Sequence, residues 1–190
     1  MANLINADPT AGLKLVSSSS SDIQIQSNGV TVCTINADGL SMNTGTLAGN
    51  GPAFSAYTDA DTQSISNATW TKVVLDTEEF DTNSNFASSR FTPTVAGYYQ
   101  INGQTNFGGI SASGHQASSL YKNGARYKDG SQNPFDATDG SGSVVSALLY
   151  FNGSTDYVEL YIFQRSGASR NANVGNIARN YFDGCLVRAA

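Results

Sequence analysis

The ten residues from Tyr98 to Phe107 constrain the fold more than any other stretch of the sequence. Their side chains alternate without a break between an apolar or small face and a face of tyrosine and carboxamides. A period of two over ten residues is typical of a β-strand and fits no helix. We expect one face to pack in a core and the other to meet water or a polar surface. The core face holds Tyr99, Ile101, Gly103, Thr105 and Phe107, and the polar face holds Tyr98, Gln100, Asn102, Gln104 and Asn106.

The rest of the region from residue 53 to residue 190 has the same character. Short apolar or alternating runs are separated by Gly, Asn, Asp and Pro, and no helical period is present. Many short strands with regular turn signals predict an all-β sandwich or jelly roll. The further strands are expected near 53–58, 70–75, 86–92, 117–122, 125–129, 143–151, 156–164 and 181–188.

Composition limits the classes of function. Charged residues make up only 13% of the chain, yet 9 Tyr and 9 Phe argue against disorder. The net charge of -5 and the absence of a Lys/Arg cluster argue against nucleic acid as the main partner. No run of residues predicts membrane insertion or a signal peptide. We therefore expect a protein of the cytosol, with Cys33 and Cys185 as buried free thiols in different modules.

Residues 1–50 contain no aromatic residue and differ from the rest of the chain. Short apolar pairs recur between turn signals, among them Asn28-Gly29 and Asp38-Gly39, which favour hairpin turns. Such short strands cannot bury their apolar faces alone. We interpret residues 1–50 as a β-structured stalk that needs partner chains, ending in a Gly-rich linker at 44–52; the alternative is a ragged tail.

The lengths of the connections predict how the main domain is oriented. Short and long connections alternate along the chain, and successive connections between antiparallel strands lie at opposite ends. The long loops should therefore share one end, the apex, and the tight turns and the C-terminus should share the other, the base. The tight turns are 95–97, 123–124 and 152–154, and the long loops are 108–116, 130–142 and 165–180.

The strand expected at 143–151 is apolar on both faces. One face belongs to the core, so Val144, Leu148 and Tyr150 point outward. Burying a large apolar side chain is worth about 1.5–3 kcal/mol, so leaving all three in water would forfeit several kcal/mol. We infer that a second subunit covers them; the alternative is cover by loops of the same chain.

An ordered series of motifs across residues 53–190 resembles the C1q-like domain of the C1q and tumour necrosis factor superfamily. The resemblance implies a ten-stranded jelly roll that forms a tight homotrimer, with the long loops at its apex. In that arrangement Tyr98, Gln100 and Asn102 face the threefold axis, beside Val144, Leu148 and Tyr150. The motifs are Ala53-Phe54-Ser55-Ala56, the Trp70–Leu75 run, Phe80-Asp81, Phe91-Thr92-Pro93 before Gly97-Tyr98-Tyr99, and Tyr181-Phe182-Asp183-Gly184-Cys185-Leu186.

The N-terminal region departs from animal members of that superfamily, since it lacks the collagen repeat of Gly at every third position. Residues 12–15 and 23–29 are instead similar to repetitive N-terminal segments of bacteriophage tail-fibre and virion fibre proteins. This similarity implies a virion protein assembled in the bacterial cytoplasm. Residues 1–50 would trimerise and attach to other virion proteins, and residues 51–190 would form the C1q-like tip.

The expected function is binding of a host-surface glycan or protein through the apex. Carboxamides, arginines and aromatic rings are the groups that hold sugar hydroxyls and ring faces. The alternatives are loops with no special role, and a trimer that decorates the virion without binding a receptor. The candidate receptor-binding residues are His115, Gln116, Gln132, Asn133, Phe135, Asp136, Arg165, Arg170, Asn171 and Asn173.

Catalysis is not expected, and calcium is the one cofactor considered. The single histidine, His115, has no nucleophile elbow near it, and Glu78-Glu79 lies toward the base. A depolymerase is therefore the least favoured function. Acidic side chains in the expected apical loops offer hard oxygen ligands for calcium, although Asp is also common in plain turns. These candidates are Asp59, Asp61, Asp136 and Asp139.

Overall fold

The computed structural model divides the chain into two compact units, Met1–Asn50 and Gly51–Ala190. The described residues contain strands and no helix, and so no helix among them could cross a membrane. In the first unit three strands form an antiparallel sheet, β1 (Ile23–Ser27), β2 (Val30–Asn36) and β3 (Gly39–Met42). The structure describes residues 23–36, 39–42, 51–59, 63–107, 113–135, 141–172 and 179–190.

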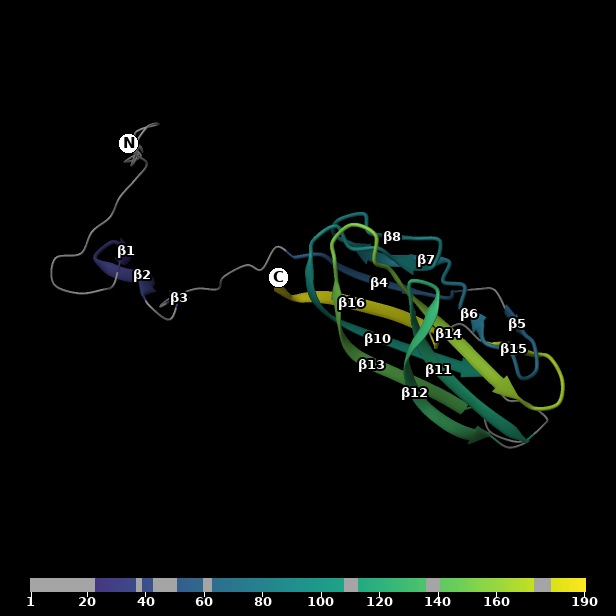
Figure 1. Ribbon diagram of the computed structural model, residues 1–190. Coiled ribbons are helices and arrows are strands. Elements are labelled where there is room, and N and C mark those ends of the chain that lie inside the picture. The colour runs from purple at the N-terminus through teal and green to yellow at the C-terminus, as the bar shows by residue number, and fades with distance from the viewer. Residues whose placement is uncertain are drawn as a thin grey trace. The chain divides into compact units, whose positions relative to one another are not determined.

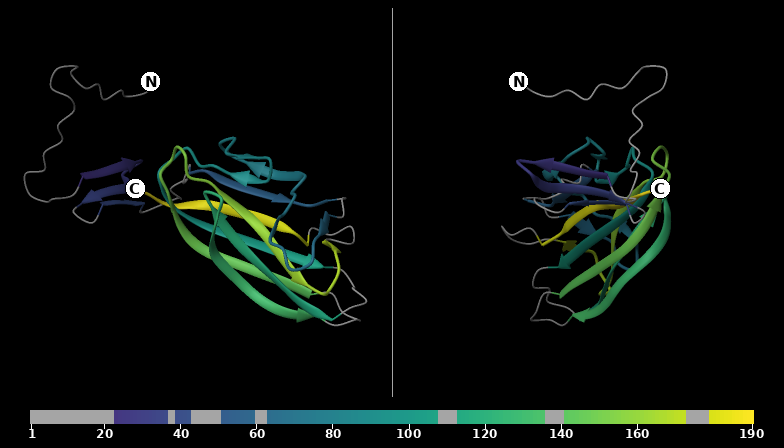
Figure 2. Two further views of the ribbon diagram at one scale, coloured as in Figure 1. Left: turned by 45° about the vertical axis from the view of Figure 1, so that its right-hand side comes forward. Right: turned by 90° about the vertical axis from the view of Figure 1, so that its left-hand side faces the viewer.

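The second unit is a sandwich of two antiparallel sheets whose long strands run along one axis (Figures 1 and 2). Sheet A has the strand order β13 (Ser141–Phe151), β10 (Gly97–Phe107), β16 (Tyr181–Ala189), β4 (Ala53–Tyr57) and β7 (Thr77–Asp81). Sheet B has the order β12 (Ala125–Phe135), β11 (Gly114–Lys122), β14 (Val158–Arg165), β9 (Arg90–Phe91) and β8 (Phe86–Ala87), and β6 (Thr71–Lys72) also pairs with β14. A small sheet joins β15 (Arg170–Ala172) to β5 (Gln63–Ile65). The predicted all-β sandwich is confirmed.

Strand β10 lies inside sheet A, between β13 and β16. Its odd-numbered residues from Gly97 to Phe107 are buried and its even-numbered residues are not, as the alternation predicted. The ladder with β13 continues without a shift from Gly97↔Phe151 to Phe107↔Ser141. Since a slip of one residue would exchange the two faces, this long continuous pairing fixes which side chains enter the core.

Aromatic rings from both sheets form the centre of the core. Phe54 of β4 stacks on Phe91 of β9 with ring centroids 4.2 Å apart, and its ring meets Phe182 of β16 edge-on at 5.0 Å. Phe91 and Phe151 both meet Tyr99 edge-on. All five rings are fully buried. Because stacked and edge-on pairs add to the gain from burial, this cluster holds the two layers together.

The tight turns gather at one end of the sandwich, as predicted. In the 152–154 turn Gly153 has φ +72°, and a Cβ there would lie 2.4 Å from the backbone nitrogen of Ala96, so the turn packs directly on the 95–97 turn. The Ala190 backbone N–H donates to the Ala96 carbonyl (3.1 Å), which places the C-terminus at the same end.

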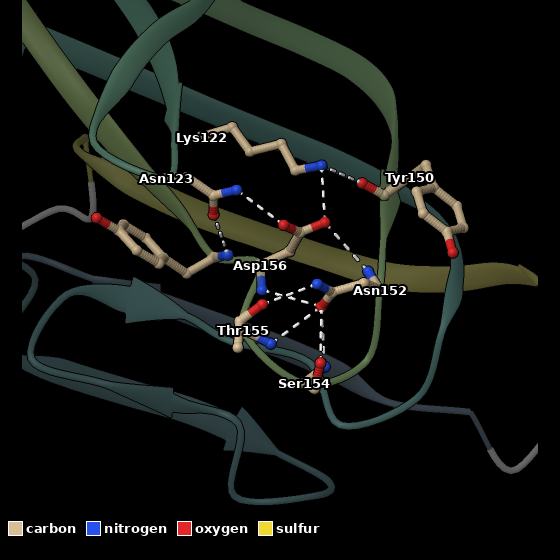
Figure 3. Close-up of polar contacts among 8 residues, drawn as sticks. Lys122, Asn123, Tyr150, Asn152, Ser154, Thr155 and Asp156 are labelled. Atoms are coloured by element: carbon tan, nitrogen blue, oxygen red, sulfur yellow. Dashed lines mark hydrogen bonds and ion pairs between the residues drawn. The ribbon is translucent and has the colours of Figure 1, made fainter.

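A polar network at this base joins the β11–β12 hairpin to the turn that leads from β13 in sheet A to β14 in sheet B (Figure 3). Asp156 accepts hydrogen bonds from the Asn123 side chain (2.8 Å) and the Asn152 backbone (3.1 Å), and pairs with Lys122 (2.9 Å). Lys122 Nζ also donates to the Tyr150 carbonyl (2.7 Å). The hydrogen bond from Asn123, with help from Lys122, lowers the pKa of Asp156 and keeps it charged. The network therefore fixes the end of β13 that carries Tyr150.

The strand ends at the opposite edge differ from the prediction. Strand β11 begins at Gly114 and β12 continues to Phe135, so residues 130–135 are a strand and not part of a long loop. Gly130 and Pro134 favour turns locally, but β12 pairs with β11 along this stretch and is an edge strand, where Pro is tolerated. The short strands β5, β7 and β15 were not predicted.

The aromatic core makes a test of the fold. We expect Phe54→Ala to lower the free energy of unfolding by about 3–5 kcal/mol, because it removes a fully buried ring from the centre of the cluster. Phe80→Ala is the matched control, since the Phe80 side chain on β7 is 50% exposed, and it should cost less than about 1 kcal/mol. Chemical denaturation measures both, and equal losses would contradict this account of the core.

Candidate functional site

A pocket of about 290 Å³ opens on the outer face of sheet B. We name it the aromatic pocket. Strands β11, β12 and β14 form its floor, and Trp70 reaches it from the segment before β6. Its lining residues are Trp70, His115, Ala117, Arg126, Asp129, Gly130, Gln132, Phe163 and Arg165.

The pocket is hollow because small residues occupy its centre. Ala117 of β11 pairs with Gln132 of β12 on one side and with Phe163 of β14 on the other. The methyl group of Ala117 therefore lies between two larger side chains. At Gly130 a Cβ would point away from the pocket, 2.3 Å from the Val144 carbonyl oxygen and 2.7 Å from Ser118 Oγ, so this position adds no side chain to the hollow.

Trp70 forms an aromatic wall of the pocket. Its ring centroid lies 5.2 Å from that of Phe163 and 6.2 Å from that of Tyr121. The Arg126 guanidinium lies over the Trp70 ring, 4.3 Å from the centroid. These contacts hold the indole in place, since stacking and cation–π attraction both favour this arrangement.

The two ends of the pocket differ in charge. At one end Arg126 donates two hydrogen bonds to Asp129 (2.7 and 2.6 Å), and Ser119 donates a third (3.0 Å). The hydrogen bonds from Arg126 lower the pKa of Asp129, so Asp129 is ionised. Its negative charge offsets the positive charge of Arg126. At the other end His115 and Arg165 are cross-strand neighbours. Within the described part of the chain, Arg165 has no ion-pair partner.

The structure brings three of the predicted receptor-binding residues together, namely His115, Gln132 and Arg165. They lie on β11, β12 and β14, so their placement in apical loops is wrong. Each belongs to a strand because backbone pairing continues further toward the apex than the local sequence suggests.

The other candidates separate from this group. Gln116 and Phe135 are buried between the sheets, where a receptor cannot touch them, and no partner for the Gln116 amide occurs among the described residues. Asn133 is half-buried and donates to the Gly142 carbonyl (2.6 Å). Arg170 and Asn171 lie on β15. Asp136 and Asn173 lie outside the described residues.

Sequence reasoning missed six pocket residues, among them Trp70, Arg126, Asp129 and Phe163. The Arg126–Asp129 pair gave a signal, because opposite charges lie close together on an expected strand and hairpin. Trp70 gave no such signal, although it is the single tryptophan of the chain. It lies far in sequence from β12, so its contact with Arg126 could not be inferred from the sequence.

The outer face of sheet A carries the residues predicted at a trimer interface. We name its exposed apolar side chains the apolar strip. Tyr98 and Tyr150 are a cross-strand pair with ring centroids 5.5 Å apart, and Leu148 pairs with Gln100. Because these side chains are exposed, the alternative of cover by the chain's own loops is wrong. The strip consists of Tyr98 (42% exposed), Val144 (48%), Leu148 (55%), Tyr150 (44%) and Val187 (60%).

The carboxamides beside the strip hydrogen-bond within the chain. The Gln100 amide donates to Ser146 Oγ (2.9 Å) and to Asn102 Oδ1 (3.1 Å). The Asn102 amide donates to Asp183 (2.9 Å). Bonds of these groups to another subunit remain a prediction, and the chain already uses their donors to order the polar part of this face.

Two carboxylates that could serve acid–base catalysis are held in structural contacts. Glu159 is nearly buried, and burial alone would raise its pKa, but hydrogen bonds from Lys72 (2.9 Å) and Arg90 (2.8 Å) leave the pKa below its usual value. Glu78 and Glu79 are successive exposed residues at an irregularity in the pairing of β7 with β4. Glu79 accepts a hydrogen bond from Ser55 (2.6 Å).

The metal and thiol predictions have mixed outcomes. Among described residues no three His, Cys, Asp or Glu side chains gather as metal ligands do. Of the calcium candidates, Asp59 is described and its backbone N–H donates to Asp76 (2.8 Å), whereas Asp61, Asp136 and Asp139 lie outside the described residues. Cys33 and Cys185 are both free, but Cys185 is exposed and not buried as expected.

No protein-family model and no curated protein sequence matches the chain. Several solved structures do. The globular domain of zebrafish complement 1qA protein superposes with a TM-score of 0.53 at 16% identity, over 74% of this chain and 99% of that one. Murine APRIL superposes with a TM-score of 0.50 at 11% identity, over 72% of this chain and 99% of that one. The Eiger TNF of S. frugiperda superposes with a TM-score of 0.52 at 9% identity, over 74% of this chain and 94% of that one. The second unit therefore has the jelly-roll fold of C1q and TNF-family domains, as the sequence motifs implied.

The Glu159 contacts predict how stability depends on pH. A carboxyl whose pKa is lowered by folding stabilises the fold above its unfolded pKa of about 4.3, and this contribution is lost as pH falls through the lower folded value. We expect Glu159→Gln to cost about 1–3 kcal/mol at pH 7, because the bonds to charged groups weaken while the cations stay partly solvated.

Denaturation between pH 2 and pH 7 measures this effect. The wild-type loss of stability below about pH 4.3 should be smaller in the Glu159→Gln variant. Glu78→Gln, at an exposed position on β7, is the control and should follow the wild type. Parallel curves for the wild type and Glu159→Gln would refute the assigned role of this carboxylate.

Proposed function

We propose that the chain is a non-enzymatic, homotrimeric fibre or spike protein of a bacteriophage. Its second unit is the tip and binds a host-surface receptor, and residues 1–50 trimerise and attach the tip to other virion proteins. Localisation in the virion after assembly in the bacterial cytoplasm belongs to the same proposal.

The apolar strip is the observation that carries the trimer. It offers five large side chains in one region of sheet A, each exposed by about half. Burial of a large apolar side chain is worth about 1.5–3 kcal/mol, so covering the strip favours association. Exposed apolar patches of this kind mark interaction sites on soluble proteins. The C1q and TNF-like fold supports three copies as the number, because the family resemblance implies a homotrimer.

The first unit supports the stalk. Among the side chains described in β1 and β2, Cys33 and Thr34 are buried, whereas Ile25, Val30 and Ile35 are at least 40% exposed. A three-stranded sheet with so little core needs other chains to become stable. The similarity of residues 12–15 and 23–29 to fibre proteins supports the same role.

A receptor-binding tip is favoured over the alternatives by the aromatic pocket. A capsid-decoration protein needs no hollow with an aromatic wall and an arginine that has no ion-pair partner among the described residues, whereas a ligand site does. Three copies of a weak site on one fibre multiply the affinity for a repetitive surface. A depolymerase is not favoured, since Glu159 is held by two cations and Glu79 accepts a hydrogen bond from Ser55.

The trimer makes the first functional prediction. Light scattering should give three times the mass of one chain, and Leu148→Asp should lower it toward that of one chain on dilution, because a charge in the covered strip stays unpaired and leaves only residues 1–50 to hold the chains together. Tyr127→Asp is the control, since Tyr127 is also 53% exposed but lies on β12 of the other sheet. A monomeric wild type, or dissociation by both substitutions alike, would disprove the assigned interface.

The proposed receptor binding makes the second functional prediction. Labelled wild-type protein should adsorb to host bacteria and reduce phage adsorption in competition, while releasing no reducing sugar from host polysaccharide. Absence of adsorption by a trimeric protein would favour decoration of the virion. Release of reducing sugar would show that the protein is an enzyme.

A further inference from the structure

The aromatic pocket carries more positive charge than the chain as a whole. The chain has a formal net charge of -5, yet the charged residues that line the pocket are Arg126, Arg165 and a single carboxylate, Asp129. Asp129 is bound to Arg126 through both oxygens. The guanidinium of Arg165 is therefore left without a counter-charge in the described part of the pocket, which calls for an anionic ligand.

His115 and Arg165 form one donor site at the end of the pocket. They are cross-strand neighbours on β11 and β14, so their side chains leave the sheet next to each other. A guanidinium binds a planar carboxylate through two parallel hydrogen bonds, and an imidazole N–H can donate a third. Both side chains stand on paired strands and not on loops, which keeps the two donors at a fixed spacing.

The rest of the pocket suits a sugar ring. Phe163 and Trp70 give an apolar wall, against which the C–H face of a pyranose can pack. Gln132 is exposed on the opposite side of Ala117 and can both donate to and accept from hydroxyls. Asp129 keeps acceptor capacity, because an ionised carboxylate has about four acceptor positions and here receives three hydrogen bonds.

The size of the pocket limits the ligand to one unit. Sites for drug-sized ligands measure about 300–1,000 Å³, and this pocket of about 290 Å³ lies at the lower bound. It opens on the flank of sheet B, so the remainder of a polysaccharide can continue along the surface. A single charged sugar, internal or terminal in a chain, fits these limits.

We propose that the aromatic pocket binds an acidic sugar, with its carboxylate on Arg165 and His115 and its ring against Phe163 and Trp70. The proposal rests on the receptor-binding function and names its ligand class. It moves the ligand site from the apical loops to the flank of the sandwich.

The single tryptophan of the chain makes this directly measurable. Trp70 lines the pocket, so intrinsic fluorescence reports binding there with no label. The trimer is titrated with methyl glucuronide, methyl galacturonide and the methyl glycoside of N-acetylneuraminic acid, and with methyl glucoside, glucose 6-phosphate and acetate as controls. We expect at least one acidic sugar to bind at least about ten-fold more tightly than methyl glucoside, because only the acidic sugar can accept a charge-assisted hydrogen bond from Arg165.

Two arginine variants locate the site. Arg165→Gln should reduce affinity for the acidic sugar to that for the neutral one and leave the neutral sugar unchanged. Arg170→Gln is the matched control, since Arg170 lies on β15 outside the pocket lining and was a candidate for an apical site. Phe163→Leu should weaken both sugars alike. Thermal melts establish that each variant is folded, and Arg165, which is exposed, can be replaced without loss of core packing.

The outcomes separate this proposal from the proposed function. Tighter binding of glucose 6-phosphate than of any acidic sugar, equal binding of acetate, or an unchanged affinity in Arg165→Gln would each overturn the acidic-sugar site. If Arg165→Gln still adsorbs to host cells like the wild type, the fibre function stands and this site falls. If the acidic sugar binds as expected but the protein does not adsorb to host cells, the site stands and the fibre function falls.

Discussion

Burial of one face of β10 is the constraint on which the rest of the second unit depends. The strand lies between β13 and β16, and its ladder with β13 is continuous over its whole length. This pairing directs Tyr99 toward Phe91 and Phe151, and so joins sheet A to sheet B through aromatic contacts. Since the register also sets which residues of β13 point outward, the same ladder that builds the core exposes the apolar strip.

The sandwich presents two outer faces with different chemistry. Sheet A exposes large apolar side chains with neutral polar groups beside them, which suits contact with another copy of the chain. Sheet B exposes a small hollow with an aromatic wall and an arginine at one end, which suits a small charged ligand. A trimer formed through sheet A would leave the pockets of sheet B free on its outer surface. The difference between the two outer faces follows from the two-layer architecture, because each sheet packs one face in the core and leaves the other face exposed.

The candidate site was only partly accessible from sequence. His115, Gln132 and Arg165 were selected for their chemistry and do meet, but they were assigned to loops. Residues 130–135 contain glycine, asparagine and proline, which locally favour turns, and pairing with β11 overrides that preference. Gln116 and Phe135 were selected by the same reasoning and prove to be buried, because a strand sends alternate side chains inward where a loop need not.

The sequence by itself determined most of the longer strands, the alternation along β10 and the grouping of tight turns with the C-terminus at the base, but not β5, β7, β15 or the far end of β12. These follow from the period of two of a β-strand and from antiparallel connectivity, which are local or topological properties. It also indicated the outward apolar face of β13. Only the tertiary structure decided that Trp70 covers Arg126 and that Ala117 lies between Gln132 and Phe163. The physical reason is that neighbours across a sheet depend on the register of strands distant in sequence, which no single stretch of the chain encodes.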